Sequence, residues 1–285
     1  MFKLLKFLIP VVFLLTGMTT ASADDKTITI GVNNWAENIA VANLWKILLG
    51  EKGYDVRLQN ADKALIYNGV AQGKIDFTFE VWLPTLDKPP YDKVKDRVAL
   101  IGPWFNEANL GLVVPDYVTI DSIEQLNANK SLFASSGQPK IIGIDSGSSL
   151  MQETEKAKKA YELNYDVQAS SESAMILSLE RAEQRKEPIV VTLWKPHWIW
   201  SKYKLKYLKD PKGVYGSADS IYGIETQTFK KRHPDVEQWL QQWKMDDNSL
   251  GTLMSEIIKQ GASTPGKGTK VWVDANRPLI QQWMH

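Results

Sequence analysis

Three tryptophans stand at the ends of three apolar runs that read as β-strands. Trp35, Trp82 and Trp194 each come within three residues of the last apolar position of such a run. The face of an indole carries negative quadrupole density, so it attracts a cation that lies over it. A quaternary ammonium group has no N–H to satisfy, and three indole faces therefore suit it. The sequence predicts a tryptophan cage, with burial of all three in the core as the alternative.

The binding free energy that such a cage can supply determines which further contacts the ligand needs. Each face contributes roughly 0.5 to 2 kcal/mol, so three supply at most about 6 kcal/mol. Micromolar binding requires about 8 kcal/mol. The remainder must come from hydrogen bonds to the other end of the ligand and from exclusion of water.

Four polar residues near the tryptophans are candidates for that other end. Glu37 follows Trp35 in a first helical turn, where it either complements the helix dipole or faces the ligand. Asn34 is a turn former that can also donate a hydrogen bond. Ser148 precedes a helix, so it is an N-cap candidate and a ligand donor. His197 lies three residues after Trp194 and is either an anion donor or an ordinary histidine.

Alternating strand and helix patterns place these residues in an α/β fold. We expect strands over residues 28–32, 54–58, 75–81, 109–115, 141–145, 189–193 and 220–225. Two of them, 109–115 and 220–225, read as crossovers between two lobes, each a mostly parallel sheet flanked by helices. Lobe 1 then comprises residues 24–113 and 219–285, and lobe 2 comprises 114–218. Ligands of such folds bind at the carboxyl ends of strands, where the tryptophans stand.

The first 23 residues read as a secretory signal peptide. Lys3 and Lys6 precede an apolar run, and Ala21-Ser22-Ala23 provides a cleavage site. The chain contains no cysteine, which excludes a lipid-anchored cysteine, disulfides and thiolate chemistry. Its near-neutral charge argues against binding nucleic acid or an anionic membrane. We therefore expect a freely diffusing periplasmic protein and a monomer.

Enzyme and metal signatures are incomplete. Residues 261–268 approach a phosphate-binding loop but have Gly268 where the magnesium-binding hydroxyl belongs. Residues 201–204 fit Ser-x-x-Lys without its companion motifs. Three histidines, none paired at helical spacing, make a zinc site improbable. We expect no cofactor, no metal and no catalysis.

Four segments carry a resemblance to a known family. They read GVNNWAENIAVANLWKILL (31–49), QGKIDFTFEVWLP (72–84), NLGLVVPDYV (109–118) and LWKPHWIWSKYKLKYLKDPKGVYG (193–216). Nearly all of the mature chain resembles the substrate-binding proteins of ABC importers for glycine betaine, choline and related osmoprotectants. The resemblance implies a two-lobed periplasmic binding protein fold around a ligand whose quaternary ammonium is boxed by aromatics. Trp35, Trp82 and Trp194 stand at the cage positions.

The resemblance also implies a partner, an inner-membrane ABC permease. Three alternatives stay open at this point. They are the same transport role with a solute lacking a quaternary nitrogen, an exported two-lobed enzyme, and a sensory module for a membrane receptor. Between ligands, Glu37 favours choline, and the resemblance as a whole favours glycine betaine.

Overall fold

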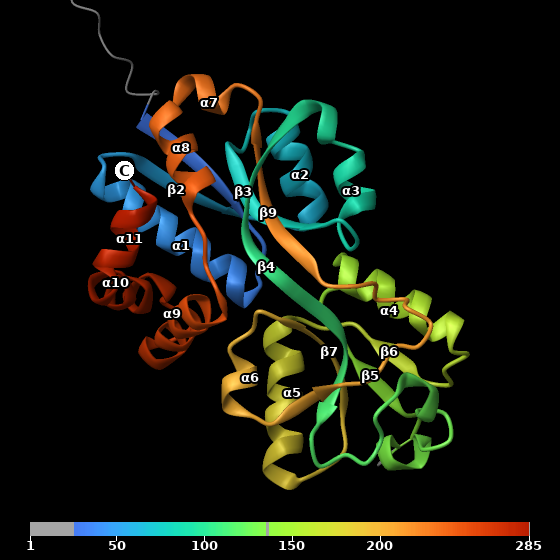
Figure 1. The fold of residues 1–285 in the computed structure, drawn as a ribbon. Helices are drawn as coiled ribbons and strands as arrows, with labels where there is room; N and C mark the ends of the chain where they lie inside the picture. Colours follow the sequence, from blue (N-terminus) through green and yellow to red (C-terminus); the bar gives the residue numbers. More distant parts are fainter. Residues whose placement is uncertain (1–25, 135–136, 285) are drawn as a thin grey trace, which may run out of the picture.

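Two lobes joined by two long strands make up the molecule (Figure 1). The computed structural model describes residues 26–134 and 137–284. The predicted signal peptide, with its cleavage site after Ala23, lies outside these residues. The connecting strands are β4 (Val98–Pro115) and β9 (Asp219–Thr226). They pair with each other antiparallel, so the junction is a hydrogen-bonded ribbon rather than a loose linker.

Lobe 1 is built on a mixed sheet with strand order β2-β1-β3-β9-β4. Its other strands are β1 (Thr27–Val32), β2 (Asp55–Asn60) and β3 (Phe77–Leu83). The strand β1 runs parallel to β2 and β3, and their connections contain α1 (Ala36–Glu51) and α2 (Lys63–Ala71). The short helix α3 (Lys88–Asp92) follows β3. Because β1 and β3 are parallel, their carboxyl ends lie at the same edge of the sheet.

Lobe 2 has a smaller mixed sheet. The second half of β4 pairs antiparallel with β7 (Val190–Lys195) and β8 (Leu205–Tyr207). Parallel strands β5 (Lys140–Ile142) and β6 (Asp166–Gln168) extend the sheet beyond β7. Its helices are α4 (Ser149–Ala160), α5 (Glu172–Arg185) and α6 (Ile199–Lys202).

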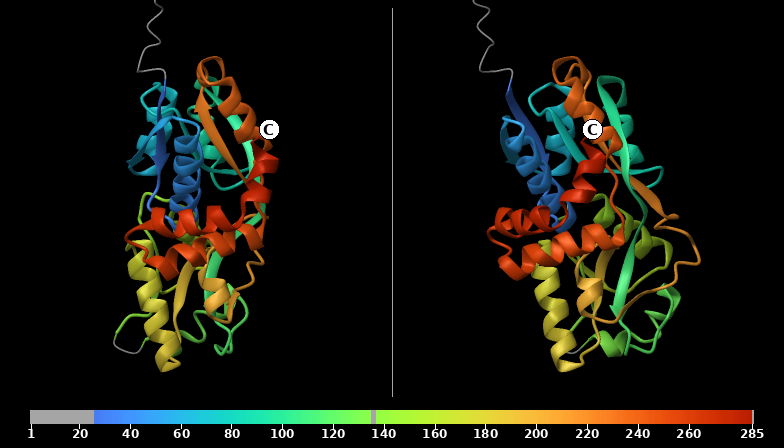
Figure 2. Two further views of the ribbon diagram at one scale, coloured as in Figure 1. Left: turned by 90° about the vertical axis from the view of Figure 1, so that its left-hand side faces the viewer. Right: turned by 60° about the vertical axis from the view of Figure 1, so that its left-hand side comes forward.

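The C-terminal segment returns to lobe 1 as five helices. They are α7 (Phe229–Arg232), α8 (Pro234–Gln242), α9 (Asp247–Gln260), α10 (Pro265–Ala275) and α11 (Arg277–Trp283). Helices α9 and α10 pack against α1, and α9 runs close to the top of α5 (Figure 2). Within residues 26–134 and 137–284, no helix has the length and apolar character needed to cross a membrane.

Most of the other tryptophans are buried in the hydrophobic core, which is the usual place for aromatic side chains. Trp104 stacks on Trp243 at 4.7 Å between ring centroids, and Trp45 meets Trp243 edge-on at 5.6 Å. All three are fully buried in lobe 1. This cluster fixes α1 and α8 to the sheet whose strand ends carry Trp35 and Trp82.

The two-lobed α/β fold is confirmed, with differences in detail. The sheets are more mixed than predicted, because both crossover strands pair antiparallel with their neighbours. The strand predicted for residues 109–115 begins at Val98, eleven residues earlier. Two register shifts and a positive φ at Glu107 interrupt its alternation, which hides it from a period-two pattern. Between β4 and β5, Ile123–Gln125 and Lys130–Phe133 form short 3₁₀ turns.

Candidate functional site

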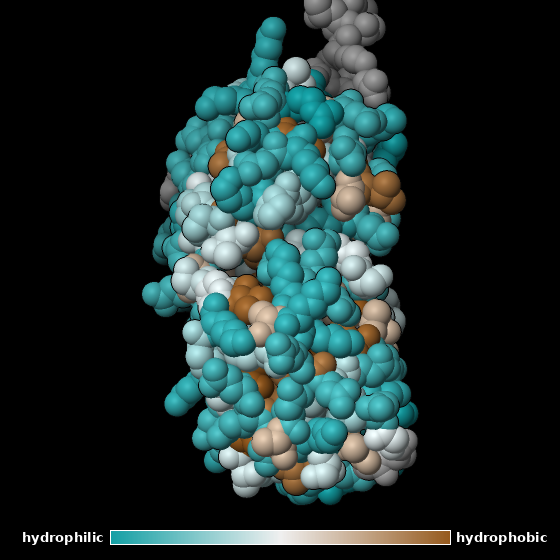
Figure 3. Space-filling view, turned by 90° about the vertical axis from the view of Figure 1, so that its right-hand side faces the viewer, coloured by the Kyte–Doolittle hydropathy of each residue, from teal (hydrophilic) through white to brown (hydrophobic). Residues whose placement is uncertain are grey.

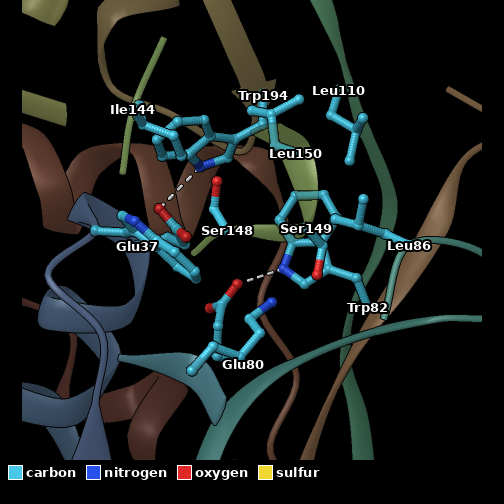
Figure 4. Close-up of a pocket in the computed structure, with 12 residues that line it drawn as sticks. Glu37, Glu80, Trp82, Leu86, Leu110, Ile144, Ser148, Ser149, Leu150 and Trp194 are labelled. Carbon is cyan, nitrogen blue, oxygen red and sulfur yellow. Dashed lines mark hydrogen bonds between the residues drawn. The ribbon is translucent and has the colours of Figure 1, made fainter. Parts of the chain in front are cut away.

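A small cavity lies between the two lobes (Figure 4). Its closely packed lining suits a ligand of few atoms. Twelve residues line it: Trp35, Glu37, Lys63, Glu80, Trp82, Leu86, Leu110, Ile144, Ser148, Ser149, Leu150 and Trp194.

All three predicted tryptophans reach this cavity. Trp35 is the N-cap of α1, Trp82 is the penultimate residue of β3, and Trp194 is the penultimate residue of β7. They are 7%, 3% and 4% exposed, so the protein around them shields the rings from solvent. The first two come from lobe 1 and the third from lobe 2. A ligand held among them therefore touches both lobes.

Each indole N–H is held by a carboxylate. Trp82 donates to Glu80 Oε1 at 2.5 Å, Trp194 donates to Glu37 Oε2 at 2.9 Å, and Trp35 donates to Asp145 Oδ2 at 2.9 Å. These bonds fix the rotation of the rings before any ligand arrives. A rigid, preformed wall lowers the entropy lost on binding.

Two of these carboxylates, those of Glu37 and Glu80, are buried in the cavity wall between Trp82 and Trp194 (Figure 4). Burial raises the pKa of Glu80 to about 7, with the charge of Asp87 adding to the rise and that of Lys63 opposing it. Burial also holds the pKa of Glu37 well above its usual range, and the charges of Glu80 and Glu172 push it further up. The two carboxyl groups thus titrate as an interacting pair. A cation placed beside them favours their ionised forms.

A third buried carboxylate, Asp87, organises the loop after β3. It accepts hydrogen bonds from the Trp82 backbone N–H at 2.9 Å, from Lys63 Nζ at 2.6 Å and from Ser149 Oγ at 2.6 Å. Lys63 also lies 5.0 Å from the centroid of the Trp35 ring. The charges of Lys63 and Asp87 offset each other, so this pair adds no net charge to the pocket.

Four hydrogen bonds cross between the lobes around the pocket. Two are the bonds of Trp35 to Asp145 and of Trp194 to Glu37, and a third joins Ser149 to Asp87. The fourth runs from the backbone N–H of Ala36, in the first turn of α1, to Glu172 Oε2 at 2.8 Å. The lobes therefore meet through polar contacts that also position the cage.

The structure brings Glu37 and Ser148 to the pocket with the tryptophans, but it does not bring Asn34 or His197 there. Ser148 also caps α4, accepting a bond from the Met151 N–H. Asn34 is exposed and faces an outer groove. His197 lies behind Trp194, with ring centroids 5.0 Å apart.

His197 instead supports the contact between lobes. Its Nδ1 accepts from the Ile199 N–H, so its Nε2 is the nitrogen that donates to Glu172 Oε1 at 3.0 Å. Glu172 is then held from both sides, by His197 in lobe 2 and by Ala36 in lobe 1. Sequence reasoning placed His197 at the ligand because spacing from Trp194 alone does not show which way its ring turns.

Several other residues that line the cavity were not predicted from the sequence. Glu80 lies two positions before Trp82, so both point to the same side of β3, and that alternation was a usable signal. Lys63, Leu86 and Leu110 carry no such signal, because chain topology alone brings them to the cavity. Among residues 26–134 and 137–284, no group of three or more His, Cys, Asp or Glu side chains is placed to hold a metal ion.

Replacing Glu172 with alanine should weaken ligand binding without altering the cavity wall. The change removes the bond to the Ala36 N–H and leaves His197 Nε2 without its acceptor. We expect about a fivefold loss of affinity, equivalent to about 1 kcal/mol for one interlobe hydrogen bond. Titration calorimetry measures it.

The matched control for that variant is Glu180→Ala. Glu180 lies on the same helix, α5, and bonds Lys202 within lobe 2. It should bind ligand as the unaltered protein does. Equal affinity for the Glu172 and Glu180 variants would show that the Glu172 contact does not stabilise the liganded arrangement.

Comparison with known proteins identifies the family. Residues 26–275 match the family model described as the substrate-binding domain of ABC-type glycine betaine transport systems. The chain belongs to this family. It is therefore a transport substrate-binding protein and not an enzyme, which removes the exported two-lobed enzyme from the alternatives.

Sequence comparison also finds a relative, the glycine betaine/carnitine transport binding protein GbuC of Listeria monocytogenes. The two chains are 36% identical over 146 residues, covering 50% of this chain and 48% of that protein. The match thus spans about half the length of the relative.

Solved structures extend the similarity across the whole fold. One is a glycine betaine/L-proline-binding protein, ProX, from Borrelia burgdorferi, with 31% identity and a TM-score of 0.85 over 91% of this chain and 97% of that one. Another is lactococcal OpuAC in a closed form complexed with glycine betaine, also 31% identical, with a TM-score of 0.82 over 91% and 100% of the two chains.

Proposed function

We propose that the protein captures a small quaternary ammonium osmolyte, of the glycine betaine or choline type, in a cage formed by Trp35, Trp82 and Trp194. The observation that carries the proposal is the convergence of three buried indoles, from both lobes, on one small cavity with two buried carboxylates. A cation there gains from the indole faces and from the negative charge of Glu37 and Glu80. Ser148 lines the same wall and would face the other end of the ligand.

Capture would couple to the arrangement of the lobes. We take lobe 1 as residues 24–113 and 219–285 and lobe 2 as 114–218, with β4 and β9 as the connection. A ligand that touches Trp194 in one lobe and Trp82 in the other stabilises only the state in which both are near. The hydrogen bonds of Trp194, Ser149 and Glu172 across the cleft would add to that preference.

The captured ligand would be delivered to an inner-membrane ABC permease by a monomer that diffuses in the periplasm. The family supports the transport role, and the proposed signal peptide supports export. The face shown in Figure 3 is mostly hydrophilic, with hydrophobic residues in separate spots, which suits a protein that meets its partner transiently. A purely sensory role for a membrane receptor would use the same capture step.

Titration calorimetry of the mature chain with glycine betaine, with choline and with L-proline tests this proposal. Proline has no quaternary nitrogen and serves as the control solute. We expect saturable micromolar or tighter binding of at least one quaternary ligand, and much weaker binding of proline. Absence of binding by both quaternary ligands to folded protein would contradict the proposal, and preference for proline would support a non-quaternary solute.

A further inference from the structure

We propose that Asp219 is a positioning residue that controls how fast the closed lobes release the ligand. It does not line the cavity. It acts through the loop after β3, residues 84–87, which it ties to the connecting strand β9. The inference rests on the proposed function and concerns the regulation of the same site.

The first observation is a buried carboxylate at the junction of the lobes. Asp219 is the first residue of β9, where the chain returns from lobe 2, and its backbone pairs with Ala108 of β4. Its Oδ1 accepts from the Thr85 N–H and its Oδ2 from the Leu86 N–H, both at 2.8 Å. Asp219 is 3% exposed, so water competes little for these charge-assisted bonds. The carboxylate therefore fixes the loop to the connecting strand.

The second observation is what this loop carries. Leu86 lines the cavity directly. Asp87 makes two bonds with the backbone of Trp82: its N–H donates to the Trp82 carbonyl at 2.8 Å, and its Oδ2 accepts from the Trp82 N–H at 2.9 Å. Its Oδ1 accepts from Ser149 of lobe 2. The position of the loop thus sets both a wall of the cage and a bond between the lobes.

The third observation is that the segment returning from lobe 2 touches the same loop. Gly216 has a φ of +73°, and a Cβ there would lie 2.5 Å from Thr85 Cγ2 and 3.3 Å from Thr85 Cβ. One residue earlier, the buried Tyr215 donates to Thr154 of α4 at 3.1 Å. Helix α4 also carries Ser149. Lobe 2 therefore holds the loop at two places, through Ser149 and through the returning segment.

These contacts predict which rate Asp219 controls. A loop fixed by Asp219 presents Asp87 to Ser149 in a single position. Without those bonds the loop is free to move, and the interlobe bond then forms at a cost in conformational entropy. The closed state becomes less favourable relative to the open one. The ligand should leave faster, while its encounter with the open state is little changed.

The test is stopped-flow tryptophan fluorescence with glycine betaine and with choline on the unaltered protein, Asp219→Asn, Ser149→Ala and the double variant. Asparagine keeps the side-chain shape but replaces one accepting oxygen with an NH₂ group, so one loop N–H loses its acceptor. We expect Asp219→Asn to raise the dissociation rate about tenfold and to change the association rate by less than about twofold.

The double variant separates this role from a purely structural one. Ser149→Ala should raise the dissociation rate about fivefold by itself. Asp219 and Ser149 bond different atoms of one loop, and Asp219 acts through the bond that Ser149 makes. The double variant should therefore release ligand about tenfold faster than the unaltered protein, and not about fiftyfold faster, as independent effects would give.

A second pair of variants keeps the Asp219 carboxylate. Gly216→Ala pushes the loop away through the contact with Thr85 and should raise the dissociation rate at least about fivefold. Gly213→Ala is the matched control. Gly213 lies in the same segment with a φ of +62°, but no atom of the described residues lies within 4 Å of a Cβ there. Alanine at either position strains the backbone, and only Gly216→Ala displaces the loop.

The outcomes distinguish this inference from the proposed function. Dissociation rates of Asp219→Asn and Gly216→Ala equal to that of the unaltered protein would overturn the inference and leave the cage intact. So would a double variant whose effect is the product of the two single effects. If Asp219→Asn does not fold, the comparison of Gly216→Ala with Gly213→Ala decides. Failure of both glycine betaine and choline to bind the unaltered protein would instead overturn the proposed function.

Discussion

Trp194→Ala is expected to lower the affinity for a quaternary ammonium ligand on the order of 100-fold or more. The substitution removes one wall of the cage, at a cost of roughly 1 to 2 kcal/mol for a desolvated cation–π contact. It also removes the donor that holds Glu37 Oε2 across the cleft, and a buried carboxylate without that donor costs about 1 to 3 kcal/mol. Calorimetry with the tightest quaternary ligand measures the combined loss.

The control for this result is Trp239→Ala. Trp239 is a partly buried tryptophan on α8, where Lys52 lies 5.2 Å from its ring centroid, and it does not line the cavity. Its loss should leave ligand affinity unchanged. If Trp194→Ala folds and binds as tightly as the Trp239 variant, Trp194 is a core residue and the cage account fails.

Affinity for a cationic ligand should rise with pH between about pH 6 and pH 8. Glu80, whose pKa burial raises to about 7, is mostly protonated and neutral at the lower pH and mostly ionised at the higher one. Glu37 shifts in the same direction and adds to the effect. Because the cation favours ionised carboxyls, binding is weaker where they are protonated. A change of about tenfold follows from the ionised fraction of Glu80 alone.

The same linkage predicts that binding at pH 7 releases protons. Calorimetry in buffers of different ionisation enthalpy, at matched pH, measures that release directly. Glu225 is a buried glutamate of lobe 1 that does not line the cavity, so Glu225→Gln should retain the pH dependence. Glu80→Gln should reduce it to the part that Glu37 contributes. Affinity that is constant or that falls from pH 6 to pH 8 would show that the ligand does not meet ionised carboxylates in this pocket.

The parts of the site that follow from strand ends could be predicted from the sequence. Trp35, Trp82 and Trp194 stand where parallel strands end, and that position alone places them at a cleft. Glu37 lies in the first turn of α1, two residues after Trp35, which places it near the same strand end. In each case a local pattern fixes the element that carries the side chain.

The rest depends on contacts between segments that are far apart in the chain. Lys63 reaches the pocket because Asp87 holds it there. The bond from Ser149 to Asp87 forms because α4 of lobe 2 meets the loop after β3 of lobe 1. The orientation of His197 is decided by Glu172, 25 residues away in the sequence. Such long-range contacts produce no periodic pattern in the sequence. The early half of β4 was hidden for a different reason, since its bulges break the alternation that marks a strand.

The carboxylates around the cage have two effects that act together. They fix the indole rings through their N–H groups, and they supply negative charge beside the rings. Glu37 does this across the cleft and Glu80 within lobe 1. A cation would therefore strengthen the contact between lobes by favouring the ionised form of the group that bridges them.

The most direct test of the cage compares a quaternary ammonium ligand with its neutral carbon isostere, choline with 3,3-dimethylbutan-1-ol, by titration calorimetry on the unaltered protein. The two molecules share shape and apolar surface, so only the charge on the central atom differs. The account predicts that choline binds at least about 30-fold more tightly, the equivalent of about 2 kcal/mol from cation–π and carboxylate interactions. Equal affinity for the two would contradict it, because the pocket would then recognise shape and not the cation.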